Sequence, residues 1–249
     1  MASINDNARV WGEAHDWSRG GSEWSDPYGS VDAQWHWSIY PRIQRFLPSR
    51  RVLKIACGYG RWTEYLLRQS KHLTAVDMNQ NCIDACLGRF GSRKGAAYLK
   101  NDGKDLSMIA NKSIDFIFSF DSLVHCDLDI IEAYVSQLRR ILKPNGFAFI
   151  HHSNLGQYFK NGRRVKNVHW RAENVSGNDM IELCIKNGLY CVSQERVQWA
   201  STTLNDAFSI ISHRHVSDRR ETIVFENYGF IEERENICRL SSLYHPAAK

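Results

Sequence analysis

The chain has 249 residues, of which 43% are hydrophobic and 24% charged, which is an ordinary composition for a globular protein. A chain of this length can bury a large single core. The 32 basic and 27 acidic residues give a net charge of +5 without long basic runs. We therefore expect no nucleic-acid partner, and the mild positive excess favours anionic ligands.

Cysteine spacing and hydropathy indicate a cytoplasmic protein without a membrane span. The seven cysteines are odd in number and include no C-x-x-C pair, so we expect free thiols. The N-terminus has no apolar signal region, and no apolar run approaches the ~20 residues of a membrane helix. Cys82 and Cys86 lie one helical turn apart without a matching second pair. Helix packing is therefore favoured over metal binding, and we expect no metal.

The first 48 residues are predicted to form an N-terminal cap. Residues 1–30 are polar but contain Trp11, Trp17 and Trp24, and disordered segments are poor in aromatic residues. We therefore expect this segment to fold onto the rest of the chain. Residues 31–47 have the spacing of an amphipathic helix, which Pro41 should interrupt. Residues 49–249 are then assigned to one domain.

From residue 52 onward the pattern alternates between strands and helices, which predicts βαβ units and an α/β fold with a mostly parallel sheet. The long polar connection at 154–176 is predicted to be functional. Strands are expected at 52–56, 73–77, 96–102, 114–120, 147–153, 190–200, 206–214 and 221–231, and helices at 60–69, 81–90, 129–143 and 178–189.

A glycine turn follows the first of these strands, in the sequence VLKIACGYGRWTEYL. Gly58 and Gly60 lack the Cβ atoms that would keep a ligand away from the backbone. The turn lies at the carboxyl end of its strand, where open α/β sheets bind ligands. A tight turn that only packs helix on strand is the alternative.

Two acidic positions strengthen the ligand hypothesis. Asp77 ends the next strand about 20 residues later, where a carboxylate can accept from two ribose hydroxyls. Its alternative role is the N-cap of a helix at 79–90. After the third strand, Asp102 could accept from an adenine amine, although Asp-Gly is also a common turn dipeptide.

As a set, these features resemble class I S-adenosylmethionine-dependent methyltransferases, as do IDFIFSFDSLVH and LRRILKPNGFAFIHHSN. The resemblance implies a Rossmann-like fold with seven strands and S-adenosylmethionine as cofactor. Lys54 is a departure, because the family usually has an acidic residue there. By this resemblance the cofactor-binding residues are Trp24, Tyr28, Ala56, Gly58, Gly60, Trp62, Asp77, Met78, Asn101, Asp102, Gly103, Phe120 and Asp121.

A closer resemblance concerns the acceptor. The combination G-Y-G-R-W-T, F-S-F-D-S-L-V-H and F-I-H-H-S-N, preceded by E-W-S and Q-W-H-W, is similar to bacterial methyltransferases of cell-surface polysaccharide and sugar biosynthesis. This implies O-methylation of a sugar or glycoconjugate. It also suggests that the Trp-rich N-terminus closes over the cofactor.

Two histidines at carboxyl ends of strands, His125 and His152, are candidate general bases for a sugar hydroxyl. Asp121 is a further catalytic candidate. An anionic acceptor would be held by basic residues of the 154–176 connection, namely Arg163, Arg164, His169 and Arg171. A second basic cluster comprises His213, Arg214, His215, Arg219 and Arg220.

Three alternatives remain at this point. The chain could methylate oxygen or nitrogen on a small molecule of secondary metabolism. It could be a non-catalytic methyltransferase-like binding protein, for which Lys54 is a hint, or an NAD-binding oxidoreductase, although its loop lacks the third glycine of that fingerprint.

Overall fold

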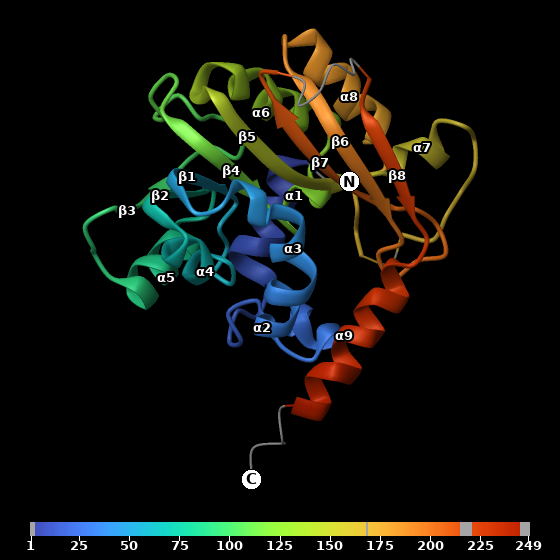
Figure 1. Ribbon diagram of the computed structural model, residues 1–249, viewed down its shortest axis with the longest axis horizontal. Helices are drawn as coiled ribbons and strands as arrows, with labels where there is room; N and C mark the ends of the chain where they lie inside the picture. Colours follow the sequence, from blue (N-terminus) through green and yellow to red (C-terminus); the bar gives the residue numbers. More distant parts are fainter. Residues whose placement is uncertain (1–2, 168, 215–220, 245–249) are drawn as a thin grey trace.

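The computed structural model describes residues 3–167, 169–214 and 221–244, and these fold around one twisted sheet (Figure 1). The sheet of the described residues has eight strands in the order β3-β2-β1-β4-β5-β7-β6-β8, one more than the seven that the family resemblance implied. β7 is antiparallel to β5 and β6, and the other pairs are parallel. The strands are β1 (Ser49–Ile55), β2 (Ser70–Asp77), β3 (Ala96–Lys100), β4 (Ile114–Ser119), β5 (Leu142–Ser153), β6 (Tyr190–Val197), β7 (Asp206–Ser212) and β8 (Ile223–Asn227).

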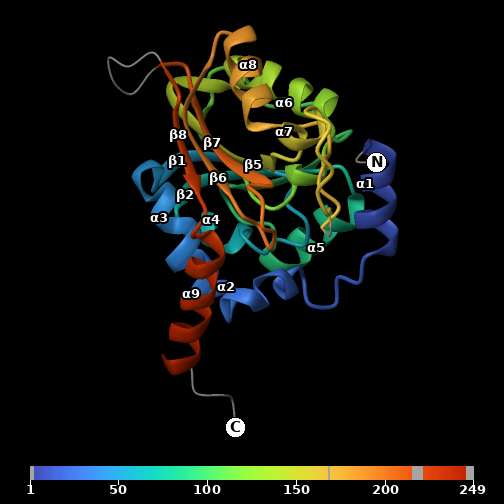
Figure 2. The same cartoon turned by 90° about the vertical axis from the view of Figure 1, so that its right-hand side faces the viewer.

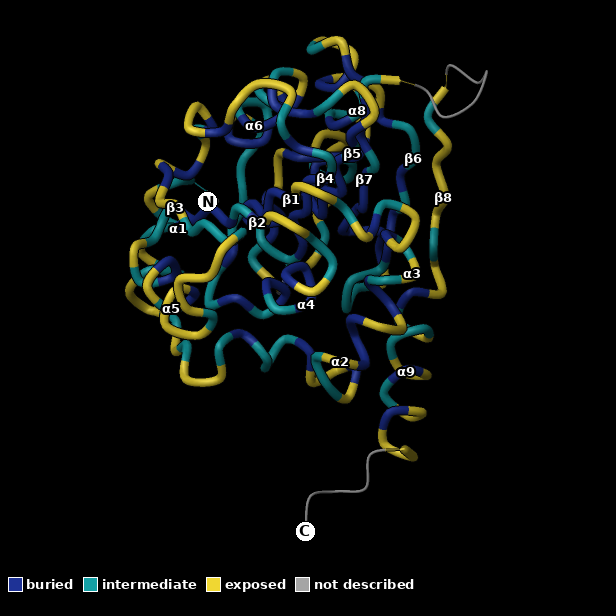
Figure 3. Tube along the Cα trace, turned by 60° about the vertical axis from the view of Figure 1, so that its left-hand side comes forward, coloured by how far each residue is buried: buried dark blue, intermediate teal, exposed yellow. Residues whose placement is uncertain are grey.

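Alternate strand residues face two separate hydrophobic layers. Leu53 and Ile117 pack with helices α6 (Leu128–Ile141) and α8 (Gly177–Lys186). Their neighbours Val52 and Phe116 pack on the opposite face with α4 (Thr63–Arg68) and the N-terminal helices. The central strands are accordingly buried on both faces, whereas the edge strand β8 is largely exposed (Figure 3). Helix α5 (Gln80–Phe90) covers β2 and β3.

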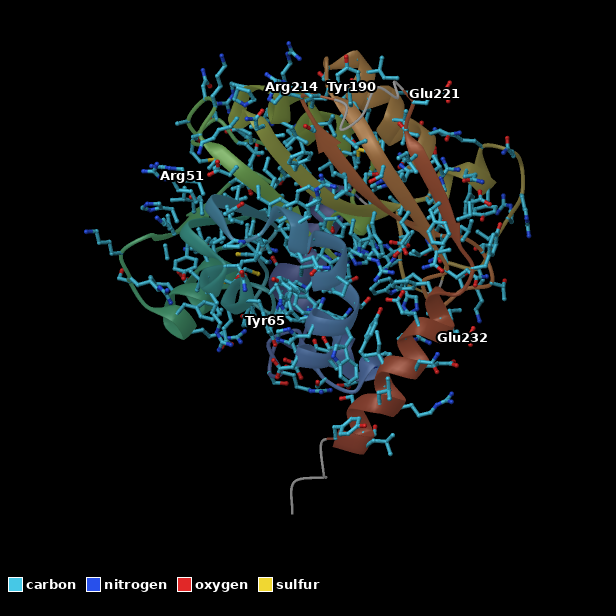
Figure 4. All side chains as sticks on the ribbon, viewed as in Figure 1. Arg51, Tyr65, Tyr190, Arg214, Glu221 and Glu232 are labelled. Atoms are coloured by element: carbon cyan, nitrogen blue, oxygen red, sulfur yellow. The ribbon has the colours of Figure 1, made fainter. Side chains whose placement is uncertain are left out.

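The helix predicted at 31–47 is present but irregular. It runs as α2 (Val31–Gln34), a π-helical turn (Trp35–Ile39), α3 (Tyr40–Ile43) and a 3-10 turn (Gln44–Phe46). The wide π turn lies just before Pro41, which cannot donate to the helical ladder. Trp35 of this segment stacks on Tyr65 of α4, which is labelled in Figure 4, at 4.8 Å between ring centroids.

The cap begins with α1 (Ile4–Arg9), a π-helical turn (Val10–Ala14) and a 3-10 segment (Ser22–Tyr28). Asn7 Nδ2 donates to the carbonyl oxygen of His125 at 2.8 Å, and Asn81 Nδ2 donates to that of Gly12 at 2.9 Å. The expectation that residues 1–30 fold onto the chain is therefore confirmed for the described residues. The division into units 1–48 and 49–249 stays a prediction.

The prediction of a strand at 221–231 was only partly correct, because helix α9 (Phe230–Tyr244) follows β8. α9 projects from the body and packs on the cap (Figures 1 and 2). Arg42 of α3 forms ion pairs with Glu195 of β6 at 2.8 Å and with Glu233 of α9 at 2.7 Å. Glu232 lies on the outer side of the same helix (Figure 4).

Two short helices complete the fold, η5 (Leu123–His125) after β4 and α7 (Gly156–Phe159) in the long polar connection at 154–176. Among the described residues, no helix combines the length and apolar character that a bilayer crossing needs.

Candidate active site

A cavity of about 420 Å³ lies at the carboxyl ends of β1, β2 and β4, between the sheet, the cap and α9. This is the expected ligand position in an open α/β sheet, and the volume suits a small molecule. Predicted site residues that line it are Trp24, Tyr28, Ala56, Gly58, Trp62, Asp77, Met78, Gly103, Phe120, Asp121, His125, His169 and Arg171.

The glycine turn and Asp77 are joined directly. The amide of Gly58 donates to Asp77 Oδ2 at 2.8 Å, and the amide of Asn79 donates to Oδ1 at 3.0 Å. Burial raises the pKa of Asp77, against these hydrogen bonds. Asn79, rather than Asp77, occupies the N-cap position of α5. The carboxylate therefore organises the turn while it also faces the cavity.

Gly60 lies outside the cavity, contrary to our expectation. Its φ is +90°, and a Cβ atom there would meet Phe90 Cε2 at 2.6 Å and Cys86 Sγ at 3.2 Å. This glycine therefore allows α5 to pack closely against the turn. Gly58, in contrast, has φ +52° and faces Trp17, whose ring a Cβ would meet at 3.2 Å.

Asn101 and Asp102 also lie outside the cavity, so we correct their predicted contact with adenine. Asp102 Oδ1 accepts from the amides of Lys104 and Asp105, which is the turn role. Asn101 donates to Asp105 O and Tyr134 OH. The cavity wall beside them consists of Gly103 and Met78, whose Cε would lie 3.4 Å from a Cβ at Gly103.

The cap closes the cavity with aromatic rings. Trp17 stacks on Tyr59 with ring centroids 4.5 Å apart and an interplanar angle of 2°. Trp11 packs on His125 at 5.0 Å, and its Nε1 donates to Asn7 Oδ1. Trp17 therefore packs directly on the glycine turn, and both tryptophans line the cavity from the cap.

The residues present fit a nucleoside cofactor such as S-adenosylmethionine. Gly58 lines the cavity without a Cβ, which lets a ligand approach the backbone beneath Trp17. Asp77 offers a carboxylate at the end of β2, and Met78 and Gly103 offer an apolar slot beyond it. This is the arrangement that a sugar and an adenine ring require.

A buried charge network forms part of the cavity wall. Asp121, with φ +55°, pairs with Arg61 at 2.8 Å and with Arg171 at 3.6 Å. Arg171 also pairs with Asp206 at 2.9 Å. Burial raises the pKa of Asp121, but the two arginines outweigh it and hold the pKa below its usual value. Asp121 is therefore ionised and fully engaged, which makes it a poor general base.

The sequence did not single out His151, yet this residue supports the network. Its Nδ1 accepts from the amide of Asp121 at 3.0 Å, and its Nε2 lies 2.9 Å from Asp206. His152 points to the other side of β5, outside the cavity, as the alternation of a strand requires. Its Nδ1 and Nε2 are 2.8 Å from Ser153 O and 2.9 Å from Ser209 Oγ. His152 cannot reach an acceptor in the cavity, so we withdraw it as a base.

His125 is the predicted base that does line the cavity. Its Nδ1 is 2.9 Å from the carbonyl oxygen of Trp170, so Nδ1 carries the proton and Nε2 keeps a lone pair. Burial and the charge of Arg171 lower the pKa of His125 to about 4. The imidazole is therefore neutral near pH 7, in the form that accepts a proton.

The basic connection is divided between the cavity and the surface. His169 and Arg171 line the cavity, whereas Arg163 and Arg164 are exposed outside it. We therefore correct the prediction that Arg163 and Arg164 hold the acceptor. In the second basic cluster, neither His213 nor Arg214 lines the cavity, and His215, Arg219 and Arg220 lie outside the described residues.

Four cavity-lining residues carry a buried polar atom for which the described residues supply no hydrogen-bond partner: Glu23, Tyr28, Trp62 and Arg234. Such atoms are costly to leave unpaired, so they indicate where a ligand binds. Arg234 of α9 was not predicted, because its approach depends on how α9 packs. Glu23 was not predicted for the same reason, because its approach to the cavity depends on how the cap packs.

Residues 52–146 match the family described as methyltransferase domain. A phosphoethanolamine N-methyltransferase from Triticum aestivum is 31% identical over 136 residues, covering 53% of this chain and 27% of that protein. A probable phthiotriol/phenolphthiotriol dimycocerosates methyltransferase from Mycobacterium ulcerans is 28% identical over 116 residues, covering 45% and 43%. The matched segment thus spans less than half of these relatives.

Solved structures show the same fold at low identity. An S-adenosylmethionine-dependent methyltransferase from Leishmania major has a TM-score of 0.62 and 12% identity, covering 84% of this chain and 82% of that one. One from Clostridium acetobutylicum has a TM-score of 0.54 and 15% identity, covering 84% and 96%. The fold, the glycine turn and the family match agree: the chain has the Rossmann-like α/β fold of these structures, and its residues 52–146 are similar to a methyltransferase domain.

Proposed function

We propose that this chain transfers a methyl group from S-adenosylmethionine to a small acceptor bound between the sheet, the cap and α9. One observation carries the proposal: a single cavity joins the glycine turn and Asp77 to a chamber lined by Phe120, Trp199 and Phe230. Alignment of donor and acceptor with exclusion of water is the main task of such an enzyme. The aromatic cap serves this exclusion.

For the acceptor, our first proposal is a hydroxyl of a sugar or glycoconjugate from cell-surface polysaccharide or glycoside biosynthesis. Two observations support it. The first is the sequence resemblance, and the second is a chamber that contains aromatic ring faces and polar atoms without a hydrogen-bond partner among the described residues. Tyr28 OH and Trp62 Nε1 are such atoms, and both residues are almost completely buried. Aromatic faces and hydrogen-bond donors together suit a carbohydrate.

A second candidate acceptor is an anionic small molecule, and Arg234 favours it. Arg61 and Arg171 are neutralised by carboxylates, whereas no ion pair of the described residues involves Arg234. An unpaired guanidinium in a cavity suits a phosphate or carboxylate. The wheat relative, whose name includes a phosphorylated amine, is consistent with this candidate.

S-adenosylmethionine supplies an activated methyl group when bound. For a hydroxyl acceptor, His125 would then take the proton through its Nε2 lone pair, with Nδ1 fixed by Trp170 O. Arg61, Asp121 and Arg171 would hold the wall of the chamber in place. For an acceptor that is already anionic at the methylated atom, no base is needed.

Methyl transfer from labelled S-adenosylmethionine to a panel of acceptors tests these proposals. The panel contains nucleotide sugars, free glycosides, phosphoethanolamine and fatty acids. Labelled glycan product would support the first acceptor, and labelled phosphoethanolamine the second. Cofactor binding without transfer to any member would favour a non-catalytic binding protein, and binding of NAD instead would contradict the whole proposal.

A further inference from the structure

A buried lysine lies beside the glycine turn in the wall of the cavity. Lys54 on β1 is 3% exposed and lines the cavity. Its Nζ donates to the carbonyl oxygens of Ala56 at 3.2 Å and Cys57 at 2.9 Å. A lysine ammonium has three N–H donors, so one remains for a ligand.

The cap brings a carboxylate, that of Glu23, to the same cavity. Glu23 Oε1 is 2.9 Å from His15 Nε2, while Oε2 is buried without a hydrogen-bond partner among the described residues. Glu23 lines the same cavity as Lys54. Its segment lies against the glycine turn, because Trp17 contacts the position of a Cβ at Gly21 as well as at Gly58.

These two groups are complementary to an amino acid. The methionine part of the cofactor carries a carboxylate and an ammonium group. We propose that Lys54 binds the carboxylate and that Glu23, reaching over from the cap, binds the ammonium. The inference rests on the proposed use of S-adenosylmethionine and assigns two specificity residues, one of which comes from outside the sheet.

The neighbouring charged groups, Arg61 and Asp77, already have partners within the protein. Arg61, the nearby arginine of the turn, is held by Asp121 at 2.8 Å. Asp77 accepts from the amides of Gly58 and Asn79. An unpaired ligand carboxylate or ammonium in such a closed site would be costly.

Calorimetric titration of the full chain with three ligands tests this assignment. The ligands are S-adenosylmethionine, its decarboxylated analogue and its deaminated analogue. Lys54→Met should weaken S-adenosylmethionine about tenfold or more and leave the decarboxylated analogue unchanged, because that ligand lacks the partner group. Glu23→Gln should weaken S-adenosylmethionine similarly and leave the deaminated analogue unchanged.

Lys71→Met and Glu13→Gln are matched controls, because both side chains are exposed and lie outside the cavity. Equal weakening of all three ligands by either cavity variant would overturn the assignment and leave the proposed function intact. Failure of the unaltered chain to bind S-adenosylmethionine would overturn both. Should Lys54→Met not fold, Glu23→Gln alone decides, since loss of selectivity against the deaminated analogue is expected for it.

Discussion

The backbone amide of Asp121 donates to Nδ1 of His151 at 3.0 Å, and this contact fixes the turn after β4. Because Nδ1 accepts, the ring proton resides on Nε2, where it is donated to Asp206 at 2.9 Å. Asp206 and Asp121 are in turn bridged by Arg171. The strained φ of Asp121 is thus held by a largely buried network that joins the end of β4 to β5 and β7.

The first prediction concerns this network. Asp121→Asn removes the anion shared by Arg61 and Arg171, whose side chains are 8% and 4% exposed. Loss of one partner from a buried ion pair is expected to lower the free energy of unfolding by about 3 kcal/mol. Urea denaturation measures the change. Asp26→Asn, which breaks an exposed pair with Arg19, is the control and should have no measurable effect.

The second prediction concerns His125 as base. His125→Gln should lower turnover about 100-fold or more for a hydroxyl acceptor and preserve cofactor affinity. Because its pKa is lowered to about 4, the neutral base persists as the pH falls from 8 to 5. Turnover should therefore show no acid limb from His125 above about pH 5. Retained activity in the variant would eliminate His125 from the chemistry.

A third prediction follows from the buried His152, whose pKa burial lowers to about 4 from an ordinary 6.5. The unfolded chain binds this proton more readily than the folded one, so stability is lost as the pH falls below 6.5. The loss from this residue between pH 7 and pH 5 should be about 2 kcal/mol. His152→Gln should flatten that part of the pH–stability curve, and an unchanged slope would refute the assignment.

The fourth prediction separates two glycines of the same turn. Gly60→Ala would force a Cβ to 2.6 Å from Phe90 at a positive φ, so it should cost about 2 kcal/mol of stability. Gly58→Ala, at φ +52° with its Cβ 3.2 Å from Trp17, should cost about 1 kcal/mol of stability and should also weaken cofactor binding. Gly88→Ala on α5 meets no atom within 4 Å and should be stabilising by about 1 kcal/mol. Thermal unfolding and cofactor titration distinguish the three.

Several local features could be predicted from residue order because their causes are local. Short apolar runs between helical segments predicted the strands from Val52 to Ser153, and the position of Asp77 after the glycine turn was correct. Asp102 was misjudged because Asp-Gly serves turns and ligands equally well in a sequence. Only the amides of Lys104 and Asp105 at its carboxylate distinguish the two.

Residue order alone determined the α/β fold, the glycine turn and the place of the acidic residue at the end of β2, because each depends on periodicity within a few residues. The tertiary structure decided which side chains share the cavity. Glu23 and Arg234 reach it from the cap and from α9, while His152 is buried away from it. These placements depend on packing between elements that are distant in sequence, which no local pattern encodes.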